Sequence, residues 1–133
     1  MRFSSSCWFL LLAFAGCGMD PASIPPPATI EVTGKAMLPN GQPITSGRIN
    51  FSPPDGSIAG TESYSNINSD GTFKLQSFGG RDGAMPGTYK VFIRSSANLP
   101  LTGVHRKYSS SATTTMIVNI TKETKDVGSI VFK

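Results

Sequence analysis

Residues 86–94 read Pro-Gly-Thr-Tyr-Lys-Val-Phe-Ile-Arg, and they give the strongest indication of the fold in the whole chain. From Tyr89 onward apolar and basic residues alternate, so that Phe92 falls on the same face as the basic residues. This period of two predicts a β-strand with one face in a core. We expect Pro86-Gly87 to form a type II turn before the strand, because Pro presets φ at the first central residue and Gly supplies positive φ at the second.

Shorter segments on both sides repeat the alternation. They are residues 30–38, 48–51, 59–67, 72–75, 114–121 and 128–133, with the weakest pattern in 59–67. Turn-forming sequences separate them: Asn40-Gly41, expected as a type I′ turn with positive φ at both residues, Pro53-Pro54-Asp55-Gly56, and Ser69-Asp70-Gly71. About seven short strands with turns between them are typical of an all-β protein, and we expect a seven-stranded β-sandwich.

The composition of the 133-residue chain supports one domain of this class, because 14 Gly and 10 Pro interrupt it too often for long helices. The longest stretch free of both, residues 104–127, has a run of Ser and Thr at its middle. Charged residues make up 15%, which is too few for a disordered acidic or basic tail. The net charge of +4 is spread along the chain, so no nucleic-acid partner is expected.

Residues 1–16 are expected to be a signal peptide. One Arg precedes the apolar core Cys7–Phe14, and these eight residues are too few for a membrane-spanning helix of roughly 20 residues but suit an export signal. The Ala15-Gly16-Cys17 that follows resembles the lipobox of bacterial lipoproteins. That resemblance implies that Cys17 receives diacylglycerol and begins the mature chain. Ordinary secretion, with Cys17 as a free thiol, is the alternative.

The mature chain is expected to have two parts. Residues 17–28 contain the lipidated Cys and four prolines, so we expect an extended tether between the lipid and the folded part. Residues 29–133 form the domain. A diacyl anchor holds a protein on a membrane more firmly than one acyl chain does, which implies a stable location at the envelope.

A set of turn and core motifs resembles the carboxypeptidase regulatory-like, or transthyretin-like, domain. The motifs are Val-Thr-Gly-Lys-Ala at 32–36, Gly-Gln-Pro-Ile at 41–44, Gly-Arg-Ile-Asn-Phe at 47–51, Ser-Asp-Gly-Thr-Phe-Lys-Leu at 69–75 and Pro-Gly-Thr-Tyr-Lys-Val at 86–91. With the lipobox and Arg-Lys-Tyr at 106–108, the chain is similar to small lipoproteins of this class from planctomycete-type bacteria. The resemblance implies a seven-stranded prealbumin-like sandwich and no particular activity, because these motifs set turns and core.

Two segments contain residues that could bind a metal or act in catalysis, and we expect neither function at either of them. Residues 66–71 match the first half of a calcium loop, but Ser77 stands where a bidentate Glu is needed, so a hairpin turn with Asp70-Gly71 is preferred. His105 is the one His of the chain, and no G-x-S-x-G motif accompanies it. The sequence therefore predicts no enzyme activity, no metal site and no cofactor.

Phe92 is the candidate ligand contact. On a regular strand its ring points away from the core, so either it contacts a sugar ring or a partner protein, or the long 96–108 connection covers it. We expect a lipid-anchored cell-envelope protein with a non-catalytic binding or structural module. The alternative is an accessory carbohydrate-binding module beside a surface hydrolase. The expected partners are the membrane, through the lipid, and an envelope protein or polysaccharide.

Overall fold

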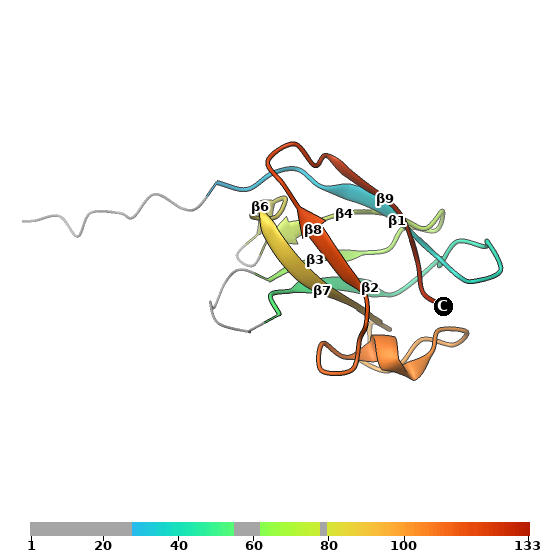
Figure 1. The fold of residues 1–133 in the computed structure, drawn as a ribbon. Helices are drawn as coiled ribbons and strands as arrows, with labels where there is room; N and C mark the ends of the chain where they lie inside the picture. The colour runs from blue at the N-terminus through green and yellow to red at the C-terminus, as the bar shows by residue number, and fades with distance from the viewer. Residues whose placement is uncertain (1–27, 55–61, 78–79) are drawn as a thin grey trace, which may run out of the picture.

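The computed structural model describes residues 28–54, 62–77 and 80–133 (Figure 1). Within them two β-sheets pack around one core, and one short 3-10 helix, η1 (Arg106–Ser109), is present. The fold is therefore mostly β and sandwich-like, as the alternation predicts. None of the described residues forms a helix long and apolar enough to cross a membrane. The expected signal peptide and all of the expected tether except Ala28 lie outside the described residues.

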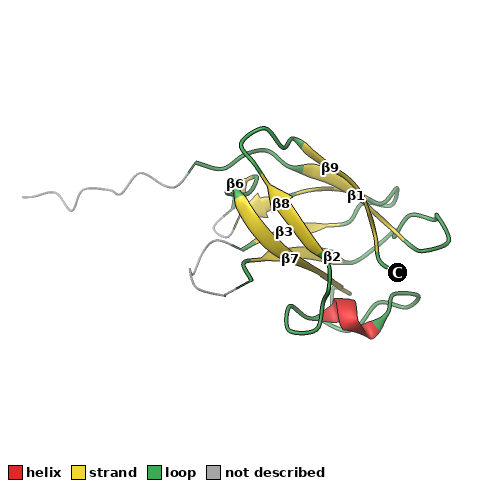
Figure 2. Cartoon of the chain, in the orientation of Figure 1, coloured by secondary structure: helices red, strands yellow, loops and turns green. Residues whose placement is uncertain are grey.

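The larger sheet has six strands in the order β6-β5-β3-β2-β7-β8, each antiparallel to its neighbours. They are β2 (Arg48–Ser52), β3 (Ser63–Asn66), β5 (Gln76–Ser77), β6 (Arg81–Asp82), β7 (Gly87–Arg94) and β8 (Ile117–Ile120). The smaller sheet consists of β4 (Thr72–Lys74), β1 (Thr33–Met37) and β9 (Asp126–Val131), with β9 parallel to β1. Figure 2 shows the strands as the main elements and the short helix at one end of the molecule.

The two sheets share one hydrophobic core. Val91 and Ile93 of β7 are fully buried, as is Phe51 of β2, so the alternation in sequence becomes an inner and an outer face. The Phe51 ring lies 6.1 Å from the Phe73 ring of the smaller sheet and 6.1 Å from the Tyr89 ring. Burial of each such side chain stabilises the fold by about 1.5–3 kcal/mol. The contact between Phe51 and Phe73 joins the two sheets, and the contact between Phe51 and Tyr89 links β2 and β7 of the larger sheet.

Residues 72–77 cross from one sheet to the other. β4 pairs with β1, and after Leu75 the chain continues as β5, which pairs with β3. Leu75 is fully buried, and its N–H donates to the Val32 carbonyl at 2.9 Å while its carbonyl accepts from the Gly83 N–H at 2.8 Å. The strand expected at 72–75 therefore extends to residue 77, with its first part, β4, in the smaller sheet and its second part, β5, in the larger one.

Several strands differ in length from the expected segments. β1 and β3 are shorter than 30–38 and 59–67, and residues 59–61 lie outside the described ones. β8 begins at Ile117 and not at Thr114, because the Thr114 side chain is buried and its hydroxyl donates to the Val91 carbonyl at 2.6 Å. A side-chain hydrogen bond takes the place of strand pairing there.

The turn at Asn40-Gly41 is present, but its expected type I′ conformation is wrong. Gly41 has a φ of 86°, whereas Asn98 is the one non-glycine residue with positive φ among those described. The Leu38 carbonyl accepts from the Gly41 N–H at 3.0 Å. Pro39 fixes the φ of the first central residue, which suits a type I turn followed by a left-handed glycine.

The expected type II turn at Pro86-Gly87 is also wrong. Gly87 is the first residue of β7, pairs with Ile120, and has a φ of 156°, far from the roughly +80° of a type II turn. The Tyr89 hydroxyl donates to the Met85 carbonyl at 2.7 Å and holds the chain before the strand. Pairing with β8 therefore overrides the local turn preference.

Candidate binding face

The side chains of β2, β3 and β7 that point away from the core form a polar and aromatic surface. The register places Arg48 of β2 opposite Arg94 of β7, and Asn50 of β2 between Tyr64 of β3 and Phe92 of β7. Residues directly opposite on neighbouring strands share one face of a sheet. All five are half-buried, and we call them the arginine–aromatic face.

Each guanidinium group of this face lies over an aromatic ring. Arg48 Cζ is 3.8 Å from the centroid of the Tyr64 ring, and Arg94 Cζ is 5.0 Å from that of Phe92. Both distances fall within the roughly 6 Å range of cation–π attraction. Arg94 Nε also donates to the Ser109 carbonyl at 2.5 Å. The rings and this carbonyl hold the two guanidinium groups in place.

The two arginines have no ion-pair partner within the described residues, although Glu62 lines the same hollow as Arg48. Arg48 Nε is buried and has no hydrogen-bond partner in the described part of the chain. Like charges that lie opposite each other on neighbouring strands destabilise a sheet. The surface is therefore electrostatically suited to an anion.

A small hollow of about 70 Å³ opens on this face and reaches down to the buried Phe51 and Ser63. Asn50, Tyr64 and Phe92 line it, and Glu62 and Ser52 border it as well. The Glu62 carboxylate accepts a hydrogen bond of 3.4 Å from the Ser52 hydroxyl. Pockets that enclose drug-sized ligands measure about 300–1,000 Å³. A ligand of this face would therefore lie along the surface and not be enclosed by it.

Phe92 lies on the outer face, half-buried beside Arg94. The long connection after β7 packs elsewhere: Val104 and Tyr108 belong to the core, and the Tyr108 ring lies 5.3 Å from the Phe132 ring. Figure 1 shows η1 at one end of the sandwich and not across the sheet. A contact between Phe92 and a ligand stays a prediction.

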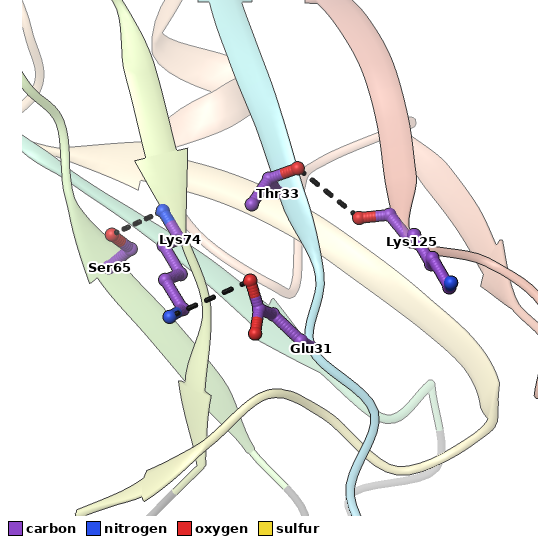
Figure 3. A network of polar contacts seen from close by, with 5 residues as sticks. All are labelled: Glu31, Thr33, Ser65, Lys74 and Lys125. Carbon is purple, nitrogen blue, oxygen red and sulfur yellow. Dashed lines mark hydrogen bonds and ion pairs between the residues drawn. The ribbon is translucent and has the colours of Figure 1, made fainter.

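A larger hollow of about 540 Å³ lies along β4, β1 and β9 of the smaller sheet. Some of the polar groups around it are paired, as Figure 3 shows: Lys74 Nζ lies 3.6 Å from Glu31 Oε1. Lys35 also lines the hollow and forms no ion pair with a described residue. The Thr33 hydroxyl donates to the Lys125 carbonyl at 3.2 Å, and the Lys74 N–H donates to the Ser65 hydroxyl at 3.2 Å. Because these groups serve strand contacts, this hollow is the weaker candidate for a ligand.

Asp70 supports a turn and not a calcium loop. Its Oδ1 accepts from the Thr72 hydroxyl at 2.5 Å and from the Thr72 N–H at 3.0 Å. These bonds, the hydroxyl bond above all, lower the pKa of Asp70 below its ordinary value. The Gly71 N–H donates to the Asn68 carbonyl at 2.9 Å, and Gly71 has a φ of 85°. The described residues contain no group of three His, Cys, Asp or Glu that could hold a metal ion.

His105 caps the 3-10 helix. The residue is exposed, and its Nδ1 accepts from the Lys107 N–H at 3.2 Å. Its carbonyl accepts from the Tyr108 N–H at 3.0 Å. The imidazole is thus used locally, to begin η1.

Sequence reasoning identified Phe92 but missed Arg48 and Tyr64 as its neighbours. Alternation did place Arg48 and Asn50 on the polar side of their strand, which is the one signal available for them. Tyr64 lay in the segment with the weakest pattern. The register between strands, which brings the residues together, depends on contacts that a single strand pattern does not contain.

Comparison with known proteins adds little. No protein-family model matches the chain, and no curated protein matches it. One solved structure, titled "Crystal Structure of the Major Plantain Pollen Allergen Pla l 1", is similar at 14% identity with a TM-score of 0.41. The match covers 79% of this chain and 93% of the allergen chain. A similarity this weak supports no conclusion about function.

Proposed function

We propose that the chain is a non-catalytic binding module held at the cell envelope by a lipid on Cys17. The observation that carries the binding role is the arginine–aromatic face, where two arginines occupy paired positions of β2 and β7, each with its guanidinium over an aromatic ring and without an ion-pair partner among the described residues. A purely structural face would gain stability from an acid at this place. An external anion would supply the same stabilisation.

The finer fold assignment is part of this proposal: a seven-stranded prealbumin-like sandwich of the carboxypeptidase regulatory-like class. Its support, apart from the motifs, is the strand count. Nine strands are described; with β4 and β5 counted as one crossing strand and the two-residue β6 left out, seven remain. An experimental structure with a different strand order would contradict the assignment.

The absence of catalysis is proposed on the roles of the candidate groups. His105 caps a helix, and Asp70 accepts hydrogen bonds within its own turn. Catalytic acids and bases are usually placed so that they face a shared reacting position. These two side chains instead serve their own backbone.

The anchor can be tested with the two cysteines of the chain as a matched pair. Wild type and Cys7→Ser should incorporate a palmitate analogue and fractionate with membranes, because Cys7 leaves with the signal peptide. Cys17→Ser should lose the label and appear in the soluble fraction. Intact mass of the mature N-terminal peptide gives a second readout. An unmodified Cys17 in the wild type would favour ordinary secretion.

An accessory carbohydrate-binding module beside a surface hydrolase is the second candidate. It is favoured by the half-buried Phe92 ring next to the Asn50 amide, since sugars pair an apolar ring face with hydroxyl groups that hydrogen-bond amides. On a glycan array, Phe92→Ala should lose binding while Thr88→Ala, at an exposed position of the same strand, retains it. Equal signals from the two variants would speak against this candidate.

A further inference from the structure

We propose that the arginine–aromatic face binds the carboxylate groups of an acidic polysaccharide, a chain of uronic acids, through Arg48 and Arg94. This inference rests on the proposed binding function and names its ligand class. It does not depend on the lipid anchor.

The two arginines form a paired anion site. Arg48 and Arg94 lie directly opposite each other on β2 and β7, where the Cα atoms of paired residues are about 4.5–5.5 Å apart. A carboxylate between them would remove the repulsion of the two cations. Lys90 adds a third positive charge at a half-buried position of β7 that shares this face. The complement of this charge pattern is an anion with more than one carboxylate.

The aromatic rings restrict the movement of the guanidinium groups before a carboxylate binds. Cation–π stacking uses the flat face of a guanidinium and leaves the N–H groups in its plane, which can donate two parallel hydrogen bonds to a carboxylate. Arg48 Cζ is held 3.8 Å from the centroid of the Tyr64 ring, and because its Nε is buried, the terminal N–H groups are the ones that a carboxylate would meet. Because contacts within the protein already hold both side chains, binding loses less side-chain entropy than it would with free arginines.

The shape of the face favours a sugar polymer. The hollow of about 70 Å³ is too small to enclose a ligand, so a sugar would lie over its mouth, where Asn50 and Phe92 are among the lining residues. A sugar ring can place its apolar face on Phe92 and its hydroxyl groups on the Asn50 amide while its carboxylate meets an arginine. An acidic peptide such as polyglutamate can hydrogen-bond Asn50 through its backbone, but it has no ring to lie flat on Phe92.

The test compares variants of the full chain, purified in neutral detergent, for binding of polygalacturonate by isothermal titration calorimetry. Arg48→Gln/Arg94→Gln should bind about tenfold or more weakly, because each lost charge-assisted hydrogen bond is worth about 1.5–3 kcal/mol. Lys122→Gln/Lys125→Gln removes the same charge at exposed positions before β9 and should bind within about twofold of wild type. Equal melting midpoints show that the variants are folded.

Further ligands and a conservative variant separate the specific site from general attraction. Arg48→Lys/Arg94→Lys keeps the charge but loses the planar, bidentate donors, so its affinity should also fall several-fold. Dextran should not bind, and dextran sulfate and polyglutamate should bind more weakly than polygalacturonate. Equal binding of polyglutamate, or equal losses in the arginine and lysine variants, would overturn the proposal.

The outcomes also separate this inference from the proposed function. If polygalacturonate does not bind while Cys17 is acylated and the protein fractionates with membranes, the ligand class is wrong and the anchored module stands. If polygalacturonate binds as expected while Cys17 is unmodified, the site stands and the anchor fails.

Discussion

Gly34 lies where β1 passes the Phe73 ring, and a side chain has no room there. A Cβ on Gly34 would lie 2.5 Å from Phe73 Cζ and 2.7 Å from Val127 Cγ2. Gly41 is different, because its φ is +86° and nothing lies within 4 Å of an added Cβ. Packing therefore requires the first glycine, and backbone conformation requires the second.

Gly34→Ala should destabilise the domain by about 1–3 kcal/mol through overpacking. Gly41→Ala should cost about 1–2 kcal/mol, from the left-handed backbone alone. Urea unfolding in a Phe73→Leu background distinguishes the two causes, since a smaller side chain relieves the clash but not the backbone strain. A Val127→Ala background tests the second close contact in the same way, and an unchanged cost of Gly34→Ala in both backgrounds would mean that the steric explanation is wrong.

Asp70 should make stability depend on acid pH. Its hydrogen bonds from Thr72 lower its pKa in the folded state, so their stabilisation is present above the unfolded pKa of about 3.9 and is lost as the pH falls through the folded value. The free-energy difference between wild type and Asp70→Asn should therefore shrink as the pH falls below about 4. In a carboxyl NMR titration, Thr72→Val should raise the pKa of Asp70. An unchanged pKa in that variant would contradict the assigned cause.

Phe132, the residue after the last strand, links β9 to β1 and to η1. Phe132 follows β9, is fully buried, and its N–H donates to the Met37 carbonyl at the end of β1 at 3.1 Å. Its ring meets that of Tyr108 in η1 edge-on, with an interplanar angle of 78°. The 3-10 helix is thus tied to the smaller sheet as well as to β7, through Arg94 and Ser109.

Phe132→Ala should cost about 3–5 kcal/mol, because it removes a buried ring and leaves a cavity between these elements. Val131→Ala is the matched control: the residue is half-buried, so its truncation should cost clearly less. The cost of Phe132→Leu should lie between those of the two Ala variants, and this variant still tests the packing if Phe132→Ala does not fold. Denaturant unfolding gives the three values, and equal costs for Phe132→Ala and Val131→Ala would contradict the packing described above.

A strand could be predicted from the sequence where its own pattern of residues determines it. Alternation located β2, β7 and β9, since the side-chain period belongs to the strand itself. It could not show that β9 runs parallel to β1 or that Arg48 faces Arg94, because those pairings join residues far apart in the sequence. At the site, alternation predicted the outward direction of Phe92 and its place on one face with Arg94, but it could not predict that Arg48 and Tyr64 join them. The prediction of a turn at Gly87 was wrong for the same reason: the glycine pairs with Ile120, which is distant in the sequence, and so belongs to a strand.

The whole domain depends on a single core that both sheets share. Phe51 links β2 to Phe73 of the smaller sheet and to Tyr89 of β7, and residues 72–77 run through both sheets. Separation of the sheets would expose all of these rings at once. We therefore expect the sandwich to unfold as one cooperative unit.

The tyrosines allow this expectation to be measured. The chain has three Tyr and one Trp, and Trp8 lies in the expected signal peptide, so near-UV circular dichroism of the mature protein reports tyrosine packing. Tyr89 reports the core side of the larger sheet, through its contact with Phe51, and Tyr108 reports η1. The near-UV signal and the far-UV strand signal should share one midpoint and one urea slope, and Phe132→Leu should shift both midpoints equally. An earlier near-UV transition in that variant would mean that η1 unfolds from a sandwich that survives without it, and the shared core would then end short of Tyr108.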